Sequence, residues 1–375
     1  MSAPGLRRAR RCALSALALA LSLFGCTAQR VGPADIAAAL ASGDATAVAR
    51  AYQQTIIQDP DSMYAAMARD GLALLTGPPL IAAPDISCSP EAEQAYRRAE
   101  DSFAADRPRA ALPDYDRATT LCPDDALYWI SAGDAYFRLG DYGRAEALFR
   151  EGLRRDPWQR SGHRFLSDTE SHLGNPAAAH AEAVLAVLSD PSYQTGWQWL
   201  KDFTVNHGGK WNRSFAVKPT ARHGADGKMV VTMEADPGSE TSRDGEKTLW
   251  LAYAMLRVAE TSGGKYGRAD WPPPSWEQRS PLERERLRVA EILSIRDAVV
   301  ARSPEAESSF WRHIATARVA GFLDEAIYLN LLDAELVPEY VAYRAEQPDR
   351  LVRYMREQLA PLPTLPGKGS DGLAL

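Results

Sequence analysis

Apolar and small residues recur along the middle of the chain at a spacing of 34 residues, within stretches of helical periodicity. The pattern is clearest in the period that starts at Ala126, where seven positions carry it: Trp129, Gly133, Tyr136, Gly140, Ala145, Phe149 and Pro157. One period earlier, equivalent positions hold Ala99, Ala111, Tyr115, Ala118 and Pro123. One period later they hold Leu166, Gly174, Ala179, Ala183, Ala186 and Pro191. Small residues let two helices approach closely and proline ends the second helix, so the pattern predicts three stacked helical hairpins.

The residues at these positions resemble the tetratricopeptide repeat (TPR), a helical hairpin of 34 residues. The resemblance implies a TPR solenoid over residues 92–207, with Trp197 and Leu200 matching the first helix of a fourth repeat. A weaker match precedes the solenoid at Gly43, Val48, Tyr52 and Pro60. We therefore expect a tether and a degenerate first repeat over residues 26–62, then a helix and an irregular loop over residues 63–91. The alternative is a set of unrelated helices that share the period by chance.

Beyond Gly209 the pattern changes to one that is typical of strands. Residues 210–222 and 229–235 alternate and contain β-branched and aromatic side chains, and a glycine-containing connection separates them. The sequence therefore predicts a β-hairpin within residues 208–241.

Helical periodicity returns over residues 242–360, which predicts a C-terminal helical domain. Three helical stretches are expected in its later part, at residues 281–302, 304–320 and 322–359. Two segments, Leu249–Tyr253 and Leu336–Tyr343, resemble the C-terminal part of uncharacterised bacterial TPR proteins, a resemblance that transfers no activity. Residues 361–375 are rich in proline and glycine and are expected to form a disordered tail. The expected fold class is mainly α: a TPR-type solenoid, a β-hairpin, and a helical domain that covers the solenoid's end.

Residues 1–25 have the anatomy of a secretory signal peptide. An arginine-rich start precedes an apolar run from Cys12 to Phe24, which is too short to span about 30 Å of hydrocarbon. The run ends at Gly25-Cys26, which resembles the lipobox of bacterial lipoproteins apart from Phe24. That resemblance implies lipidation of Cys26 and, because Thr27 follows, anchoring at the periplasmic face of the outer membrane. The alternative is an ordinary signal peptide, for which no convincing Ala-x-Ala cleavage site follows.

Export would leave Cys88 and Cys122 as the two remaining cysteines in an oxidising compartment. Cys88 lies just before the first helix of the first clear repeat, and Cys122 lies just after its second helix. Antiparallel helices bring these ends together, so a Cα separation below about 7 Å and a disulfide are expected. The alternative is a pair of buried or free thiols.

The charge balance narrows the class of partner. The 375 residues carry 43 basic and 49 acidic side chains, a net charge of −6. Without the first 25 residues, which hold four arginines and no acid, the net charge is −10. This excess of acid argues against a nucleic acid partner, and against membrane contact other than through the lipid anchor.

The sequence offers no recognisable catalytic motif. It lacks the His-Glu-x-x-His, Cys-x-x-Cys, Walker-type and Gly-x-Ser-x-Gly patterns, and its six histidines are scattered. We therefore expect no enzyme activity, no metal site and no cofactor. Asp324, Glu325 and Glu335 could act as acids and bases, but their spacing fits the solvated edge of an amphipathic helix. Trp271 and Trp276 flank a proline run, which predicts a loop pinned to the core rather than a recognition surface.

One acid recurs at the ninth position of each repeat's first helix, the helix that lines the concave groove in the TPR family. These four acids, called the acidic column below, are Glu100, Asp134, Asp168 and Asp202. The residues expected around them on the same faces are Tyr96, Phe103, Ile130, Phe137, Arg138, Arg164, His172 and Gln198. Acids flanked by aromatic side chains predict a groove for a protein or peptide that bears Lys or Arg. The alternative is a solvated stripe, or one that is paired internally with Arg138 and Arg164.

The function predicted from these features is that of a non-catalytic, membrane-anchored periplasmic adaptor that binds a protein or peptide partner in its concave groove. Two alternatives remain: an envelope enzyme with a site in the C-terminal domain, and a structural subunit of an envelope assembly complex. A deep polar pocket with shifted carboxylate pKa values would favour the enzyme. A large apolar patch on the convex side of the solenoid would favour the structural subunit.

Overall fold

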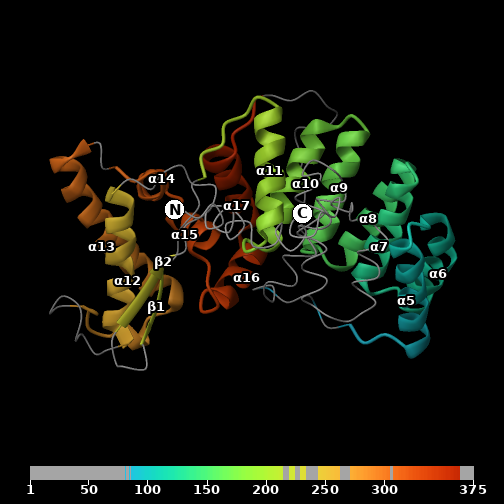
Figure 1. Ribbon diagram of the computed structural model, residues 1–375, viewed down its shortest axis with the longest axis horizontal. Helices are drawn as coiled ribbons and strands as arrows, with labels where there is room; N and C mark the ends of the chain where they lie inside the picture. Colours follow the sequence, from blue (N-terminus) through green and yellow to red (C-terminus); the bar gives the residue numbers. More distant parts are fainter. Residues whose placement is uncertain are drawn as a thin grey trace, which may run out of the picture. The chain divides into compact units, whose positions relative to one another are not determined.

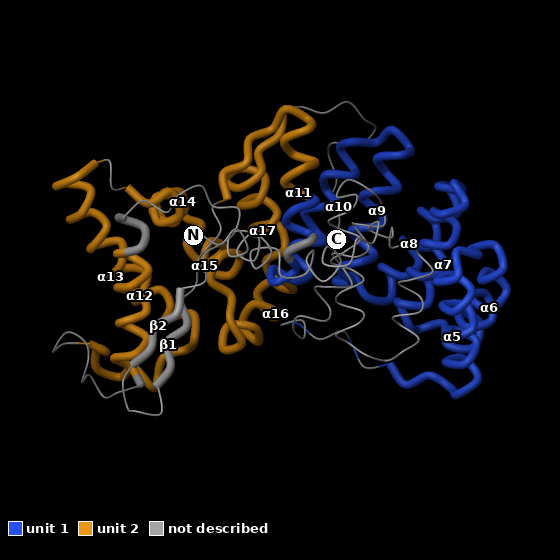
Figure 2. The backbone as a smooth tube through the Cα atoms, in the orientation of Figure 1, with its two compact units in different colours: residues 1–199, 366–372 blue, residues 200–365, 373–375 orange. Residues whose placement is uncertain are grey.

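The computed structural model describes residues 81, 84, 86–213, 219–223, 229–233, 244–261, 271–304 and 307–363. The predicted signal peptide, the Cys26 anchor and the degenerate repeat lie outside the described residues. So do most of the predicted helix and loop over residues 63–91, and the tail beyond residue 363. The chain divides into two compact units, residues 1–199 with 366–372 and residues 200–365 with 373–375 (Figure 2).

The first unit consists of consecutive helical hairpins (Figure 1). Its helices are α5 (Pro90–Ala104), α6 (Pro108–Leu121), α7 (Ala126–Arg138), α8 (Tyr142–Arg155), α9 (Arg160–His172) and α10 (Pro176–Ser189). Helix α5 packs on α6, α7 on α8 and α9 on α10 within the hairpins, while α6 contacts α7 and α8 contacts α9 between them. Helix α11 (Gln194–Asn206) follows, and the boundary between the two units falls within it. The predicted series of TPR-like hairpins is therefore present.

The turn after each first helix contains a residue with a positive φ angle at one fixed position of the 34-residue period. Gly140, Gly174 and Gly208 have φ angles of 76°, 79° and 77°, and Asp106 occupies the equivalent position with 56°. Glycine adopts this left-handed region without a Cβ penalty, and aspartate is among the few other residues that tolerate it. In the three hairpins of the first unit, this turn sets where the second helix begins, whereas the turn at Gly208 leads into an extended segment.

Small residues are required where the two helices of a hairpin cross. A Cβ at Gly133 on α7 would lie 2.6 Å from the ring of Phe149 on α8, which is too close for packed atoms. Ile130, which the sequence places on the exposed face, is only 1% exposed. This expectation is wrong because Ile130 fills the space above Gly152 and Gly162, at the contact with the following helices.

A contact recurs between each inter-repeat turn and the first helix that follows it. The fourth residue of the helix reaches back six residues to a proline carbonyl oxygen. The pairs are Trp129 with Pro123 (2.8 Å), His163 with Pro157 (2.9 Å) and Trp197 with Pro191 (2.8 Å). The equivalent position of the first clear repeat holds Ala95, which cannot make this contact. In this repeat Cys88, before α5, lies close to Cys122, in the turn before α7, with their Cα atoms 5.6 Å apart.

The second unit contains a two-stranded antiparallel sheet and the C-terminal helices (Figure 1). Its elements are β1 (Pro219–His223), β2 (Met229–Met233), α12 (Asp244–Thr261), η1 (Trp276–Gln278), α13 (Pro281–Arg302), α14 (Ser309–Val319), α15 (Leu323–Leu331), α16 (Val337–Glu346), α17 (Pro348–Tyr354) and the π-helical turn η3 (Met355–Leu359). In the sheet, Thr220 lies opposite Thr232 and Arg222 lies opposite Val230. None of the described helices is both long and apolar enough to cross a bilayer.

The segment from Lys210, predicted to start the first strand, does not belong to the sheet. The backbone N–H groups of Lys210 and Asn212 donate hydrogen bonds of 2.9 Å to the carbonyl oxygens of Pro361 and Leu359. Strand β1 begins only at Pro219. An alternating pattern shows that a segment is extended, but it does not show which distant segment will pair with it. The same contacts hold Pro361, where the sequence predicts a disordered tail to begin.

The helical stretch predicted over residues 322–359 is divided among α15, α16 and α17. After α15, the Asp333 carboxylate accepts a hydrogen bond of 3.1 Å from the Glu335 N–H and stabilises a turn. Pro338 and Pro348 then stand in the first turns of α16 and α17. Proline is favourable there because the first N–H groups of a helix have no partner within it.

Aromatic side chains form the core of the second unit. Trp250 on α12 packs against Phe310 and Trp311 on α14, with ring centroids 4.9 and 5.0 Å apart. Trp271 and Trp276 are both buried, with their ring centroids 5.1 Å apart. The proline run between them is therefore pinned to the core, as predicted.

Candidate functional site

The charges of two acids of the acidic column, Glu100 and Asp168, act on a third, Asp134, in the first unit. Glu100, Asp134 and Asp168 occupy the same position of α5, α7 and α9, and each is half-buried. Burial is the main cause that raises the pKa of Asp134 from 3.8 to about 7. Arg164 and Arg138 oppose this rise, and the charges of Glu100 and Asp168 add to it. The repeat has therefore brought the three carboxylates into one electrostatic cluster.

Glu100 and Asp168 each have a partner within the unit. Tyr115 on α6 donates a hydrogen bond of 2.6 Å to Glu100, and burial together with this carboxylate raises the pKa of Tyr115. Arg164 precedes Asp168 by one turn of α9 and donates to it at 3.2 Å. Arg164 is 4% exposed and lies over the ring of Phe165, 4.3 Å from its centroid. The predicted alternative of internal pairing thus holds for Arg164.

Arg138 is paired with an acid outside the column. Its guanidinium lies 2.6 Å from the carboxylate of Asp106, in the turn of the preceding hairpin, and 5.4 Å from the ring centroid of Phe103. Asp106 stands where the other repeats have a glycine with positive φ, so the acid that contacts α7 is part of the turn itself. Arg138 therefore links two hairpins and partly covers Phe103.

Tyr96 connects α5 to α7. Its ring stacks on Tyr128 with centroids 4.5 Å apart, and its hydroxyl lies 3.0 Å from the hydroxyl of Ser131. The side chain also packs against the buried residues near the cysteines. Most of Tyr96 is thus used within the unit, which leaves less of it for a partner than the sequence predicts.

Phe137 and His172 belong to an aromatic cluster with Tyr142, a residue that the sequence analysis did not predict to be part of the site. Their ring centroids are 5.3 Å apart, and Tyr142 stacks on His172 at 4.5 Å and meets Phe137 edge-on at 5.3 Å. His172 is exposed and Phe137 is half-buried. Tyr142 was missed because it starts α8, a second helix. An aromatic residue two positions after the turn glycine, Gly140, is the feature of the sequence that could have predicted it.

Gln198 and Asp202 are both exposed on α11. They are one turn apart and so share a helix face. The boundary between the units falls between them. The relation of Asp202 to the other acids of the column stays a prediction.

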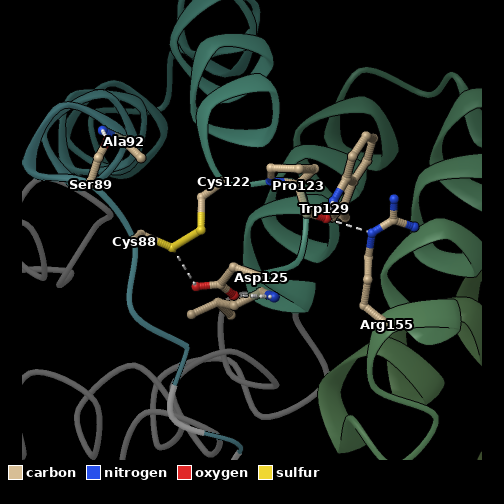
Figure 3. The surroundings of a disulfide bond; sticks show 9 residues. Cys88, Ser89, Ala92, Cys122, Pro123, Asp125, Trp129 and Arg155 are labelled. Carbon is tan, nitrogen blue, oxygen red and sulfur yellow. Dashed lines mark hydrogen bonds between the residues drawn. A yellow bond between two sulfur atoms is a disulfide. The ribbon is translucent and has the colours of Figure 1, made fainter.

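Cys88 and Cys122 meet beside the turn before α7 (Figure 3). Their Cα atoms are 5.6 Å apart and their Sγ atoms 2.05 Å apart. Figure 3 shows Asp125 next to this pair, with its Oδ2 3.7 Å from the Sγ of Cys88. Burial raises the pKa of Asp125, which also caps α7 through the Leu127 N–H. The Cα separation of 5.6 Å is below the upper bound of about 7 Å expected for a disulfide.

Charged side chains in the core of the second unit are paired with one another. Arg288 on α13 donates two hydrogen bonds of 2.8 Å to Glu260 on α12 and also contacts Glu285. Tyr253 on α12 donates to Glu285 at 2.7 Å, and burial raises the pKa of Tyr253. These contacts tie α12 to α13.

Glu325 does not lie on a solvated helix edge, as the sequence predicts. It is 0% exposed and accepts hydrogen bonds from Tyr343 and, at 2.6 Å, from Arg350. The expectation is wrong because α15 is covered by α13, α14 and α17, so even its charged positions face protein. Among the carboxylates of the described residues, a raised pKa is found for Asp125 and Asp134, and both lie in the first unit rather than in the C-terminal domain.

The repeat region matches a known family. Residues 126–169 match the model of the tetratricopeptide repeat. The match covers α7, α8 and most of α9, and further helical hairpins lie on both sides of this segment in the first unit. No curated protein sequence matches the chain.

Three solved structures of TPR domains are similar to the chain. The first TPR of Spaghetti, bound to an HSP90 peptide, is 14% identical, covering 32% of this chain and 98% of its own, with a TM-score of 0.31. YrrB, a TPR protein with an unusual peptide-binding site, is 17% identical, covering 44% and 88%, with a TM-score of 0.29. The TPR2AB domain of yeast Sti1, in a complex with HSP90, is 16% identical, covering 46% and 69%, with a TM-score of 0.29.

Proposed function

We propose that the first unit is a protein-binding adaptor whose partner carries Lys or Arg side chains. The contact surface, called the first-helix face below, is formed by Glu100, Phe103, Asp134, Phe137, Asp168 and His172. One observation carries the proposal: the charges of Glu100 and Asp168, one from the hairpin on each side, both raise the pKa of Asp134. A peptide that crosses successive hairpins would meet one carboxylate per repeat.

The surroundings of Asp134 favour recognition of a cation. The carboxylate is half-buried, and Coulomb interactions are stronger in such surroundings than in water. A partner's ammonium or guanidinium group would replace the proton that burial and the neighbouring acids favour. Charged contacts of this kind mainly speed association and select partners, whereas apolar contacts with Phe137 would slow dissociation.

We infer further that the chain is exported and anchored by a lipid on Cys26 at the periplasmic face of the outer membrane. The apolar run before Cys26 and the lipobox-like Gly25-Cys26 support export and lipidation. The short distance between Cys88 and Cys122 supports an oxidising compartment, where such a pair would form a disulfide. The adaptor would then hold its partner close to the membrane.

Crosslinking in the native envelope would recover the partner, and a titration would then test the site. The Asp134→Asn/Asp168→Asn double variant should associate more slowly and lose most of the salt dependence of binding. Phe137→Ala should instead dissociate faster. Asp116→Asn is the matched control, because it removes one exposed acid from α6, a second helix.

If the double Asn variant associates at the wild-type rate and with the wild-type salt dependence, the acidic column does not contribute to binding. An Asp116→Asn variant with an equal loss would show that total charge, rather than the first-helix face, attracts the partner.

A further inference from the structure

The two cysteines of the first unit lie between the starts of two first helices (Figure 3). Cys88 precedes Ser89, whose side chain accepts a hydrogen bond of 3.2 Å from the Ala92 N–H and caps α5. Cys122 follows α6, in the turn before α7. A bond between the two sulfur atoms therefore holds the starts of α5 and α7 together, and both helices contribute to the first-helix face.

The two cysteines differ in burial. Cys122 is 7% exposed and belongs to a buried cluster with Ala118 and Tyr128, whereas Cys88 is half-buried and packs against the edge of that cluster. In thiol-disulfide exchange a thiolate attacks a sulfur of another disulfide, so the reacting sulfur has to be accessible to the second molecule. Cys88 is therefore the cysteine that an external disulfide reaches first.

A carboxylate lies beside this accessible sulfur. The Oδ2 atom of Asp125 is 3.7 Å from the Sγ of Cys88, a distance at which a thiol can donate a hydrogen bond, since sulfur is larger than oxygen. The Oδ1 atom has a separate role, because it accepts a hydrogen bond of 2.9 Å from the Leu127 N–H and caps α7. One oxygen thus holds the helix while the other faces the cysteine (Figure 3).

The surroundings of Asp125 make it a stronger base than an exposed carboxylate. Burial raises its pKa, and the N–H groups of Leu127 and Tyr128 oppose this rise only in part. Proton transfer from a thiol to a carboxylate is easier when their two pKa values lie closer together. The position of Asp125 therefore suits the removal of a proton from Cys88.

Ionisable side chains on three helices lie around Asp125 or around the residues that it contacts. They are Glu93, Tyr96 and Arg97 of α5, Tyr128 of α7 and Arg155 of α8. Burial is the main cause that raises the pKa of both tyrosines, so both are neutral below about pH 10. Arg155 donates to the carbonyl oxygen of Pro123, in the same turn, at 2.6 Å.

We propose that Cys88 is a thiol-disulfide exchange site at which Asp125 accepts the thiol proton and an external disulfide oxidises the cysteine pair. The Cys88 thiolate attacks one sulfur of the donor's disulfide, and the donor's second sulfur leaves as a thiolate. Cys122 then loses its proton to solvent, and its thiolate attacks the Sγ of Cys88 and releases the donor's first sulfur. Two electrons pass from the two cysteines to the donor, and the donor's two thiolates take up the two protons. This chemistry needs no partner on the first-helix face.

Single-cysteine variants test which sulfur exchanges. In the full-length chain, Cys12→Ser and Cys26→Ser leave Cys88 and Cys122 as the only thiols. Cys122→Ser or Cys88→Ser is then added, the reduced protein is mixed with glutathione disulfide, and mass spectrometry follows the mixed disulfide. The variant that keeps Cys88 should react at least about tenfold faster than the variant that keeps Cys122, and the two should react equally in urea. Equal rates in variants that retain the parent's circular dichroism, or a faster reaction at Cys122, would show that Cys88 is not the exchange site.

Asp125→Asn tests the proton acceptor, because asparagine caps a helix as well as aspartate but does not take up a thiol proton. Formation of the Cys88–Cys122 bond by glutathione disulfide should be about tenfold slower in this variant at about pH 6.5. At about pH 9.5 it should be equal or faster, because the thiols ionise without a base and the charge of Asp125 opposes the thiolate. Asp141→Asn, the matched control, alters the side chain that caps α8 through the Arg144 N–H and should change neither rate. A ratio of variant to wild-type rates that is the same at both pH values would show that Asp125 acts through the helix alone, and the proposed proton transfer would be wrong.

Discussion

At the residue scale, the clearest feature is Asp134, an acid whose ionised form is less favourable in the folded protein than in the unfolded chain. Asp134 is half-buried on α7, and the acids of the neighbouring hairpins add to the cost of ionising it. Arg164 and Arg138 offset only part of that cost. Arg164 forms its ion pair with Asp168 at 3.2 Å, and Arg138 forms its ion pair with Asp106 at 2.6 Å. A residue in this position stabilises the fold less than an amide would, which is consistent with a role in binding.

Asp134→Asn should raise the stability of the first unit at about pH 8 and leave it nearly unchanged at about pH 3. The folded-state pKa of Asp134 is raised from 3.8 to about 7, so between these values the unfolded chain releases its proton first and stability falls as pH rises. Below pH 3.8 both states are protonated and the residue has no effect. Because solvent reaches the side chain, the expected gain is about 1–2 kcal/mol, less than the full shift implies.

Urea unfolding of the variant and the wild type at both pH values measures this effect, with Asp116→Asn as the charge control. The sequence alone suggests that removing Asp134 should leave stability nearly unchanged, because the acid is expected to be exposed. A variant less stable than the wild type at about pH 8 would show that the arginines stabilise the carboxylate more than burial disfavours it.

At the scale of elements, each hairpin depends on a turn residue with positive φ and on a contact that orients the next hairpin. The turn position holds glycine in three repeats and Asp106 in the first clear one. The orienting contact is a side chain that reaches a proline carbonyl in three repeats. In the first clear repeat, the equivalent position holds Ala95, which cannot make this contact.

Gly140→Ala should destabilise the protein by about 1 kcal/mol, because alanine is unfavourable at positive φ even where no atom obstructs its Cβ. Gly143, three residues later in α8, provides the matched control, since its Cβ would also meet open space. Gly143→Ala should be neutral or stabilise by up to about 1 kcal/mol, because alanine is the better helix former. Equal effects of the two substitutions on the unfolding midpoint would contradict the assignment of the turn.

Removing the Cys88–Cys122 link should lower the free energy of unfolding by about 3–4 kcal/mol, because a closed loop of this size restricts the unfolded chain. The Cys88→Ser/Cys122→Ser variant, compared with the wild type by urea unfolding, measures this loss. The wild type treated with reductant should lose a similar amount. Two free thiols in protein purified from the periplasm without reductant would show that the bond does not form.

At the scale of the whole molecule, the chain combines a repeat unit with a second unit of different construction. The first repeats a hairpin whose neighbours supply most of its contacts, as solenoids do. The second depends on contacts between distant segments, such as Lys210 with Pro361 and Arg257 with Asp333 at 2.8 Å. In the part of the chain that the structure describes, the repeated hairpins belong to the first unit, and the proposed binding surface lies there.

Replacing Cys26 by Ser should release the protein to the soluble fraction or block its processing, because the thiol is the proposed site of lipidation. Fractionation of cells that express the wild type and the variant measures the change, and N-terminal sequencing of the mature protein gives the cleavage site. A wild-type protein that partitions into water and begins at a residue other than Cys26 would show that the lipid anchor is absent.

The sequence by itself determined the repeat fold, because a hairpin's contacts lie within one period of 34 residues. Trp129, Gly133 and Phe149 mark the helices, the close crossing and the core of a unit that is then repeated. The proximity of Cys88 and Cys122 also followed, since antiparallel helices bring their flanking residues together. The recurrence of one acid in each 34-residue period was likewise evident from the sequence.

Only the tertiary structure decided which side chains are buried and which distant segments pair. Ile130 and Glu325 occupy positions that periodicity assigns to an exposed face, yet neighbouring helices cover both. Lys210 pairs with Pro361 because the two segments meet in space, which no local pattern records. The shifted pKa of Asp134 arises in the same way, from burial and from charges on adjacent hairpins. Periodicity reports the side of a helix that is apolar, whereas burial and electrostatics depend on everything that packs around it.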